Sequence, residues 1–339
     1  MKYMAISLSG VTGQKPMEVE FKGSELLVCN RTAVGIEVEL ENFANASLQG
    51  KNGKLSYWQS THDGSLKHNG IELIGCVSAG SNIYLPLVGE NVVKGLEELK
   101  EVFELNEKHG YVPELSERTS VHVHIDVRDM SAEELHRMLL LYLVFEIPLF
   151  KFAGEHRKNN AYCIPLAQNK MLLGRLDHLR GESPSGILTT INQGTKYDAA
   201  NIYSVRQKGS VEFRMHEGCT DTGRLLNWIN LLLSLKVAAK TLTTWTSVQL
   251  PNYFSAVGSD EFMLQVFSPD LYRILKYEGI EYDVLKGIRF CQDVLLDKLL
   301  SQYTSEHALS QTSSYKGKQE DLIVYKFCST KRSFNPEAF

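Results

Sequence analysis

Segments in which apolar and polar side chains alternate predict the strands of a sheet. In residues 33–42 aliphatic side chains alternate with glutamates, and in residues 119–127 they alternate with histidines and an aspartate. A period of two is typical of strands with one buried and one polar face. Further strands are predicted at residues 57–60, 71–74, 202–206 and 210–216. The last two are predicted to form a hairpin that turns at residues 207–209.

Apolar residues at helical spacing predict helices between and after these strands. The helices are predicted at residues 91–109, 131–145, 222–244, 260–277 and 283–300. Ser131 and Glu134 form a capping box for the second helix, which Pro148 is predicted to end. Residues 154–200 are rich in Gly, Asn and Pro and are predicted to be irregular. Interspersed strands and helices, with one polar strand face, predict an α+β fold with an antiparallel or mixed sheet and helices on one side.

Composition and charge exclude several classes of protein. The chain has 339 residues, of which 43% are hydrophobic and 22% charged, which excludes a disordered or low-complexity protein. A net charge of −4 gives no general attraction to nucleic acid or to an anionic membrane, so neither partner is expected. The longest apolar stretch, residues 138–150, contains Glu146 and Pro148 and is too short to span a bilayer.

The N-terminus and the cysteines indicate the compartment. The first 14 residues lack the apolar core of a signal peptide. The six cysteines are scattered without a CxxC pair, which is typical of reduced, mostly buried thiols. We therefore expect a cytoplasmic protein.

The polar faces of the predicted strands are rich in metal-ligand and phosphate-binding residue types. They include Glu37, Glu39, Glu72, His122, His124, Asp126, Glu212, Arg214 and His216. Carboxylates gathered in one place repel one another unless cations neutralise them, and hard oxygen ligands favour Mg²⁺ or Mn²⁺. Arg206 and Arg214, on the predicted hairpin, are suited to phosphate oxygens. Carboxylates for metal and arginines for phosphate together predict nucleotide-dependent phosphoryl transfer.

No phosphate-binding loop accompanies these residues. The sequence contains neither GxxxxGK[ST] nor GxGxxG. If ATP is the nucleotide, metals and side chains must therefore hold it.

Several motifs, in this order, resemble the amidoligase family, which belongs with glutamine synthetase and glutamate–cysteine ligase among the carboxylate–amine ligases. The motifs are Gly35-Ile36-Glu37-Val38-Glu39, Asp63-Gly64-Ser65, Gly70-Ile71-Glu72-Leu73, Val121-His122-Val123-His124, Arg157-Lys158-Asn159-Asn160-Ala161-Tyr162-Cys163, Asn201 and Val211-Glu212-Phe213-Arg214. Each motif alone is weak, but their order is specific. The resemblance covers about residues 31–245.

The resemblance implies a set of metal ligands and phosphate contacts. The implied metal ligands are Glu37, Glu39, Glu72, His122 and Glu212. It places His124 near the nucleotide phosphates and makes Arg206 and Arg214 phosphate-binding, catalytic arginines.

It also implies contacts with the two substrates. Asp63 matches the Asp of an Asp-Gly-Ser turn near the incoming amine, where it acts in catalysis. Arg157, Asn160 and Asn201 match positions that contact substrate or nucleotide. The substrates would be small-molecule or peptide carboxylates and amines, and residues 154–200 with the loops near Asp63 would set their specificity.

The implied activity is that of an ATP- and Mg²⁺-dependent (or Mn²⁺-dependent) ligase. Transfer of the γ-phosphoryl of ATP to a carboxylate would give an acyl phosphate, which an amine then attacks to form an amide. The implied fold is a glutamine-synthetase-like curved, mainly antiparallel sheet with helices on one face. Residues 1–30 would form an N-terminal β extension, 31–245 the catalytic domain and 246–339 a mostly helical C-terminal extension.

Other interpretations remain open. The His122-x-His124 pair, with Asp126, could bind Zn²⁺ in a hydrolase, although that needs further histidines such as His156, His178 or His216. A non-catalytic binding protein could use the same scaffold. The second Glu-x-Glu pair, Glu18 and Glu20, is interpreted as a solvated strand face, and Cys163 as a buried thiol rather than a nucleophile.

Overall fold

The computed structural model of the protein describes residues 6–15, 32–49, 55–67, 70–80, 83–181, 183–242 and 249–293. These residues belong to one compact unit, Met1–Leu295. The strand expected around Met17–Phe21, with Glu18 and Glu20, lies outside the described residues, as do residues 294–339 of the expected C-terminal extension. The proposed division into three parts stays a prediction.

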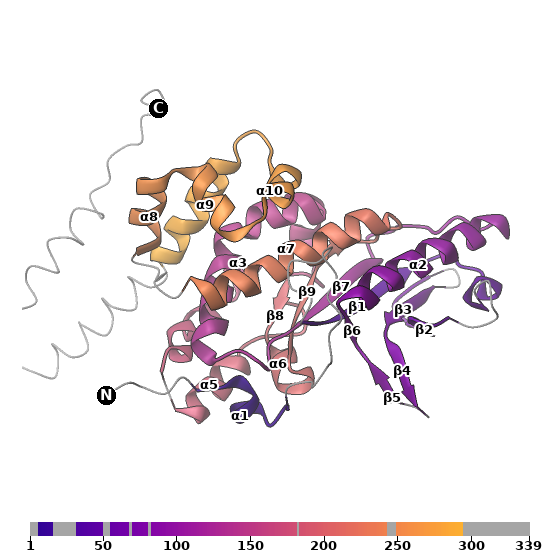
Figure 1. The fold of residues 1–339 in the computed structure, drawn as a ribbon, viewed down its shortest axis with the longest axis horizontal. Helices are drawn as coiled ribbons and strands as arrows, with labels where there is room; N and C mark the ends of the chain where they lie inside the picture. Colours follow the sequence, from indigo (N-terminus) through magenta and orange to yellow (C-terminus); the bar gives the residue numbers. More distant parts are fainter. Residues whose placement is uncertain are drawn as a thin grey trace, which may run out of the picture. The chain divides into compact units, whose positions relative to one another are not determined.

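Most strands of the described chain form one open antiparallel sheet (Figure 1). The strands are β1 (Ala33–Leu40), β2 (Trp58–Thr61), β3 (Ile71–Gly75), β4 (Val77–Gly80), β5 (Ile83–Leu85), β6 (Leu87–Val88), β7 (Ser120–Asp126), β8 (Ala200–Asn201) and β9 (Ser210–Glu217). The sheet has the order β2-β3-β1-β7-β9-β8, β6 also pairs with β1, and β4 and β5 form a separate hairpin. The predicted mixture of helices and antiparallel sheet is confirmed.

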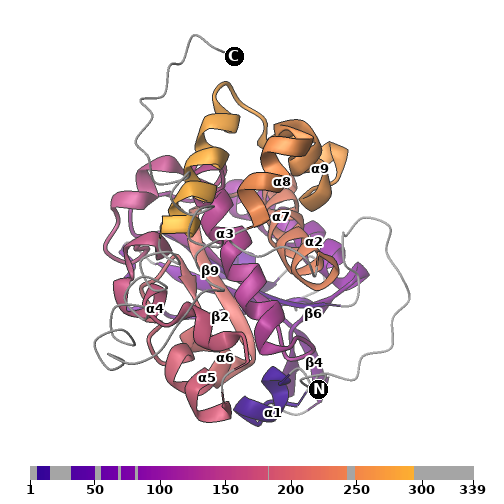
Figure 2. The ribbon, with the colours of Figure 1, turned by 90° about the vertical axis from the view of Figure 1, so that its left-hand side faces the viewer.

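The helices of the described chain lie between and after these strands. They are α1 (Leu8–Thr12), α2 (Glu90–Lys108), α3 (Ala132–Ala153), α4 (Lys170–Leu173), α5 (Pro184–Ile191), α6 (Tyr203–Lys208), α7 (Thr222–Thr241), α8 (Gln249–Val257), α9 (Ser259–Val266) and α10 (Pro269–Leu275), with 3-10 helices at Asn45–Gln49, Glu155–Asn159, Leu166–Gln168 and Leu176–Leu179. Figure 2 shows α1, α5 and α6 at one end of the unit, and α8 and α9 at the other. No helix in the described ranges has the length and apolar character needed to cross a membrane.

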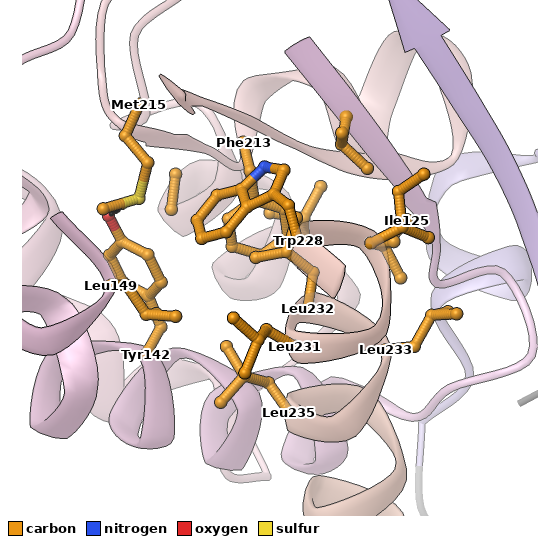
Figure 3. Close-up of a cluster of buried hydrophobic side chains, with 14 of the residues drawn as sticks. Ile125, Tyr142, Leu149, Phe213, Met215, Trp228, Leu231, Leu232, Leu233 and Leu235 are labelled. Carbon is orange, nitrogen blue, oxygen red and sulfur yellow. Dashed lines mark hydrogen bonds between the residues drawn. The ribbon is translucent and has the colours of Figure 1, made fainter. Parts of the chain in front are cut away.

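One face of the sheet forms the hydrophobic core with helices α3 and α7. Alternation within β7 and β9 directs Ile125 and Phe213 to this face, and both are fully buried. Figure 3 shows Trp228 of α7 and Tyr142 of α3 in the same buried cluster as these strand residues. The rings of Tyr142 and Phe213 lie 5.6 Å apart. The opposite side chains of the same strands therefore face away from the core.

Helix α3 begins where predicted but does not end at Pro148. The capping box of Ser131 and Glu134 is present, and the helix continues to Ala153. Proline has no N–H, so the Val144 carbonyl lacks its usual helical donor. The backbone of Gly287 packs closely there, because a Cβ on that glycine would lie 2.3 Å from the Val144 oxygen.

The C-terminal helices pack on α3. The ring of Phe145 lies 5.0 Å from that of Phe267 and 5.8 Å from that of Phe262. The thiol of Cys291, in the helix at residues 280–293, donates to the Leu140 carbonyl. The helix predicted at 260–277 is two helices, α9 and α10, because Pro269 begins a new one after the cap Ser268.

The predicted hairpin at 202–216 is wrong in its first strand. Residues Tyr203–Lys208 form α6, and only Ala200–Asn201 pairs with β9 on that side. Gly209 ends the helix in the left-handed conformation, with φ of 72°, and its N–H donates to Val205. A glycine at this position permits the change from helix to strand within one residue.

Two further expectations are corrected. Residues 6–15 of the expected β extension contain α1, which Ser7 caps by accepting from the Gly10 N–H. The region 154–200, expected to be irregular, contains short helices, of which α5 is the longest. Ser183 caps α5 and Pro184 occupies its first turn, a signal that the sequence did contain.

The buried carboxyl of Glu146 in α3 predicts a pH dependence of stability. It accepts from the backbone N–H groups of Leu166 and Ala167. Burial, with those hydrogen bonds opposing it, raises the pKa of Glu146 to about 7. The protonated form is thus favoured in the folded state, and its stabilisation is lost as pH rises from about 4.5 to about 7.

We expect Glu146→Gln to remove this dependence. The free energy of unfolding of the wild type, relative to the variant, should fall by roughly 2 kcal/mol between pH 5 and pH 8. Urea denaturation at both pH values measures the difference. Glu133→Gln, an exposed glutamate of the same helix, is the control. If the difference in unfolding free energy between wild type and Glu146→Gln is the same at pH 5 and pH 8, the expectation is wrong.

Candidate functional site

The polar face of the sheet brings the predicted acidic and histidine residues together. Cross-strand neighbours in β1, β3, β7 and β9 are Glu37–His122, Glu39–Glu72 and His124–Glu212. Side chains that are directly opposite across a ladder lie within contact distance of one another. We call these six residues the acidic–histidine cluster. Its side chains are buried or half-buried, and those of His122 and Glu37 are 4% and 17% exposed.

Two groups within this cluster could each hold a metal ion. One group is Glu37, Glu72 and His122, and the other is Glu37, His124 and Glu212. In each group the three ligand atoms lie within 4.8 Å of one another. Glu37 belongs to both groups. Each group offers two carboxylates and one imidazole, a donor set that suits Mg²⁺ or Mn²⁺ better than Zn²⁺.

Glu39, also predicted as a ligand, belongs to neither group. Its Oε2 accepts from the Ser120 hydroxyl, and its Oε1 lies 3.8 Å from His122 Nε2. Glu39 is buried beside the group of Glu37, Glu72 and His122. In this geometry it holds Ser120 and adds negative charge to the cluster.

Ser120 fixes the orientation of His122. Its hydroxyl donates to Glu39, so its Oγ accepts from His122 Nε2–H at 2.7 Å. This hydrogen-bond network assigns the proton of a neutral His122 to Nε2 and leaves Nδ1 as an acceptor. His122 Nδ1 faces Glu37 Oε2 at 3.2 Å.

Ser210 fixes the orientation of His124 in a similar way. The ammonium of Lys208 lies 3.5 Å from His124 Nε2 and can only donate, so Nε2 is the acceptor. Nδ1–H then donates to Ser210 Oγ at 3.0 Å. His124 Nε2 also faces Glu37 Oε1 at 3.3 Å.

These contacts test whether the cluster fits a metal ion. Both histidines turn an unprotonated nitrogen toward an oxygen of Glu37, and two acceptors at such distances repel unless a cation lies near both, as Lys208 does at His124. Histidine ligands commonly donate their other ring N–H to a neighbouring acceptor, as His122 and His124 do to the two serines. The residues present therefore fit a divalent cation.

Electrostatics divides the carboxylates into two kinds. Burial opposes the ionisation of Glu37, but its close contacts with the imidazoles of His122 and His124 hold its pKa well below the usual value. Burial likewise opposes ionisation of Glu212, whose pKa is nevertheless lowered by His124, Arg214 and His122. For Glu72 the opposing effect of His122 is smaller. The burial of Glu72 and the charges of Glu37 and Glu39 raise its pKa to about 7.

A β-bulge in β9 begins at Arg214, which points toward the cluster. Arg214 and Met215 of β9 lie opposite the single residue His122 of β7. Arg214 Nη1 donates to Glu212 and lies 3.5 Å from His122 Nδ1. After the bulge, His216 faces the core with its ring 5.6 Å from that of Trp228. Its predicted place on the polar face is wrong, because the extra residue reverses the alternation.

Asn201, Arg157 and Asn160, predicted as substrate contacts, hold parts of the site in place. Asn201 Nδ2 donates to Glu212 Oε2 at 2.7 Å. Arg157, almost fully buried, donates to the carbonyls of Glu117 and Arg214, each at 3.2 Å. Asn160 also donates to Glu117. Arg157 Nε and Asn201 Oδ1 are buried and have no hydrogen-bond partner among the described residues.

The Asp-Gly-Ser turn lies near Glu72. Asp63 Oδ1 accepts from the Ser65 N–H at 2.8 Å, and the Asp63 charge contributes to the raised pKa of Glu72, after burial and the charges of Glu37 and Glu39. Arg118 donates to the Ser65 carbonyl at 2.7 Å and connects this turn to the segment before β7.

Arg206 does not join the cluster among the described contacts. It is exposed on α6 and donates to Asn192 Oδ1 at 3.1 Å. Residues two apart on a helix point in different directions, and it is Lys208 that reaches the cluster. Lys208 Nζ lies 3.3 Å from Glu37 Oε1. The prediction that Arg206 binds phosphate assumed that residues 202–206 form a strand, whereas they belong largely to α6.

Sequence reasoning missed Lys208, Ser120 and Ser210. The two serines stand two residues before His122 and Glu212, so strand alternation already placed them on the polar face. Lys208 carried no comparable signal, because residues 207–209 were interpreted as a turn.

The other candidate chemistries receive little support. Burial raises the pKa of the Cys163 thiol to about 12, which keeps it protonated and agrees with a buried thiol. His156 is exposed beside Glu217, and His216 is in the core. Among the described residues, neither donor group contains a second histidine.

Comparison with known proteins identifies the family. A family model described as "Putative amidoligase enzyme" matches residues 18–236. The matched segment includes the whole acidic–histidine cluster and the bulge at Arg214. A comparison with curated proteins finds no match. The model spans more than half of the chain, and the protein belongs to the amidoligase family.

Proposed function

We propose that the protein is an ATP-dependent carboxylate–amine ligase that forms an amide through an acyl phosphate, with Mg²⁺ or Mn²⁺ as its metal, on a glutamine-synthetase-like sheet. Membership of the amidoligase family indicates a ligase. The observation that carries the finer proposal is the pair of donor groups sharing Glu37, with Arg214 beside them. Carboxylates that can hold divalent ions next to a guanidinium suit a triphosphate.

Each residue of the site has a role in this proposal. Glu37, Glu72 and His122 would hold one ion, and Glu37, His124 and Glu212 another. A bound Mg²⁺ or Mn²⁺ would supply charge neutralisation and polarise phosphate oxygens.

Arg214 would contact a phosphate oxygen. Its contact with Glu212 holds the guanidinium at the edge of the cluster, where it can stabilise charge on the transferred phosphoryl group. Asn201 would keep Glu212 in position.

Asp63 would act on the second substrate. A carboxylate near the amine can take the proton that the amine loses when it attacks the acyl phosphate. The donors that fix the Asp-Gly-Ser turn, including Arg118, would keep that carboxylate in place.

The zinc hydrolase alternative is less well supported. Each donor group has a single imidazole and two carboxylates, whereas catalytic zinc sites use mostly histidine. Tightly bound zinc together with turnover in the absence of nucleotide would favour it. A non-catalytic protein would show no nucleotide-induced rise in melting temperature.

Hydroxylamine trapping tests the ligase proposal. The protein is incubated with ATP, Mg²⁺, hydroxylamine and a pool of carboxylic acids, and mass spectrometry identifies any hydroxamate. We expect a hydroxamate only when ATP is present. Glu37→Gln should lower its yield about 100-fold or more, because both donor groups lose a shared carboxylate. Glu104→Gln, an exposed glutamate of α2, is the matched control.

Circular dichroism of both variants confirms that each is folded. A hydroxamate formed without ATP, or an undiminished yield from Glu37→Gln, would contradict the proposed reaction.

The serine contact of His122 gives a second prediction. In Ser120→Ala the imidazole loses the acceptor that holds its proton on Nε2. We expect Mn²⁺ affinity to fall about 10-fold, as for other residues that orient metal ligands. Isothermal titration with Mn²⁺ measures it, and Ser185→Ala, an exposed serine of α5, should leave it unchanged. Equal affinity in Ser120→Ala and wild type would show that Ser120 does not orient the ligand.

A further inference from the structure

Lys208 reaches the acidic–histidine cluster from the solvent side. Its Nζ lies 3.3 Å from Glu37 Oε1 and 3.5 Å from His124 Nε2. The side chain is 54% exposed, whereas that of Glu37 is 17% exposed. Lys208 therefore covers part of the cluster without being buried in it.

The ammonium contacts atoms that a divalent ion would also need. Glu37 Oε1 lies 3.3 Å from His124 Nε2, which lies 3.8 Å from Glu212 Oε1. These residues form the second donor group. A metal ion bound there would approach its ligands to about 2 Å, and a second cation in contact with the same two atoms would be strongly repelled.

In the other donor group Lys208 contacts only the shared residue, Glu37. Among the described residues, no ammonium or guanidinium forms an ion pair with Glu72. Arg214 and Lys208 compensate Glu212 and Glu37, respectively. The two donor groups therefore differ in how many of their ligands Lys208 contacts: both Glu37 and His124 in one group, and Glu37 alone in the other.

The backbone around Lys208 is fixed while its side chain is free to turn. Lys208 is the last residue of α6, and Gly209 reverses the chain into β9 through its left-handed conformation. A lysine has a long stem with several rotatable bonds and a compact charge. It can leave the cluster without moving the helix.

We propose that Lys208 is an internal counter-ion of the group of Glu37, His124 and Glu212, which a divalent ion must displace, and that the displaced ammonium then pairs with an anionic group of the nucleotide. This inference rests on the proposed function. Its consequence is that binding of the metal and binding of the nucleotide are coupled through one side chain.

Mn²⁺ titration without nucleotide tests the first half. The signal of free Mn²⁺ in electron paramagnetic resonance gives the affinity directly. We expect Lys208→Met to bind one Mn²⁺ roughly fivefold to tenfold more tightly than wild type, because the competing charge is gone. Lys208→Arg retains the charge and should remain close to wild type. Lys94→Met, which removes an exposed lysine paired with Glu90 on α2, is the matched control.

Binding of a non-hydrolysable ATP analogue at saturating Mn²⁺ tests the second half. Calorimetry should show roughly fivefold to tenfold weaker binding to Lys208→Met and near wild-type binding to Lys208→Arg. A calorimetric result equal to wild type for Lys208→Met would overturn the pairing with the nucleotide.

The outcomes separate this inference from the proposed function. If wild type binds Mn²⁺ and Lys208→Met binds it equally or more weakly, the counter-ion role is wrong while the metal site stands. If neither wild type nor any variant binds Mn²⁺, the proposed function fails, and the counter-ion role fails with it.

Discussion

Repulsion between carboxylates is the constraint around which this structure is arranged. Glu37, Glu39, Glu72 and Glu212 come from three strands and gather on one recessed sheet face. Two imidazoles, a guanidinium and an ammonium lie among these carboxylates, yet burial and the charges of Glu37 and Glu39 still raise the pKa of Glu72. A face with this excess of negative charge is stable only because the strands cannot separate, and it attracts any cation that can enter.

The opposite face of the same strands supplies that rigidity. Each residue of the cluster alternates with a buried side chain, so a shift that relaxed the acidic face would disturb the core. The short helices after α3 add a second layer of support, since Arg157 holds the backbone of Arg214 at the bulge. Donor atoms held in this way are suited to a site that must not reorganise during a reaction.

Strand alternation made much of the site predictable from sequence. A period of two places Glu37 with Glu39, His122 with His124, and Glu212 with Arg214, and antiparallel pairing then brings the three strands together. Local sequence could not show the β-bulge that turns His216 into the core, because a register shift depends on both strands.

The sequence pattern also did not reveal helix α6, which replaces the strand predicted at residues 202–206. Residues 202–206 have an alternating pattern, but Gly209 ends a helix there, and Lys208 is thereby directed at Glu37. Local sequence also did not show that α3 continues past Pro148, where the backbone of Gly287 packs against Val144.

The packing of α3 has a practical consequence for anyone who shortens the protein. The family model ends at residue 236, yet Phe145 is covered by Phe262 and Phe267, which lie beyond that boundary. A fragment trimmed to the matched segment would present these aromatic and aliphatic surfaces to water and would be prone to aggregate. The segment that the family model matches is therefore shorter than the segment whose side chains form the packed core of this structure.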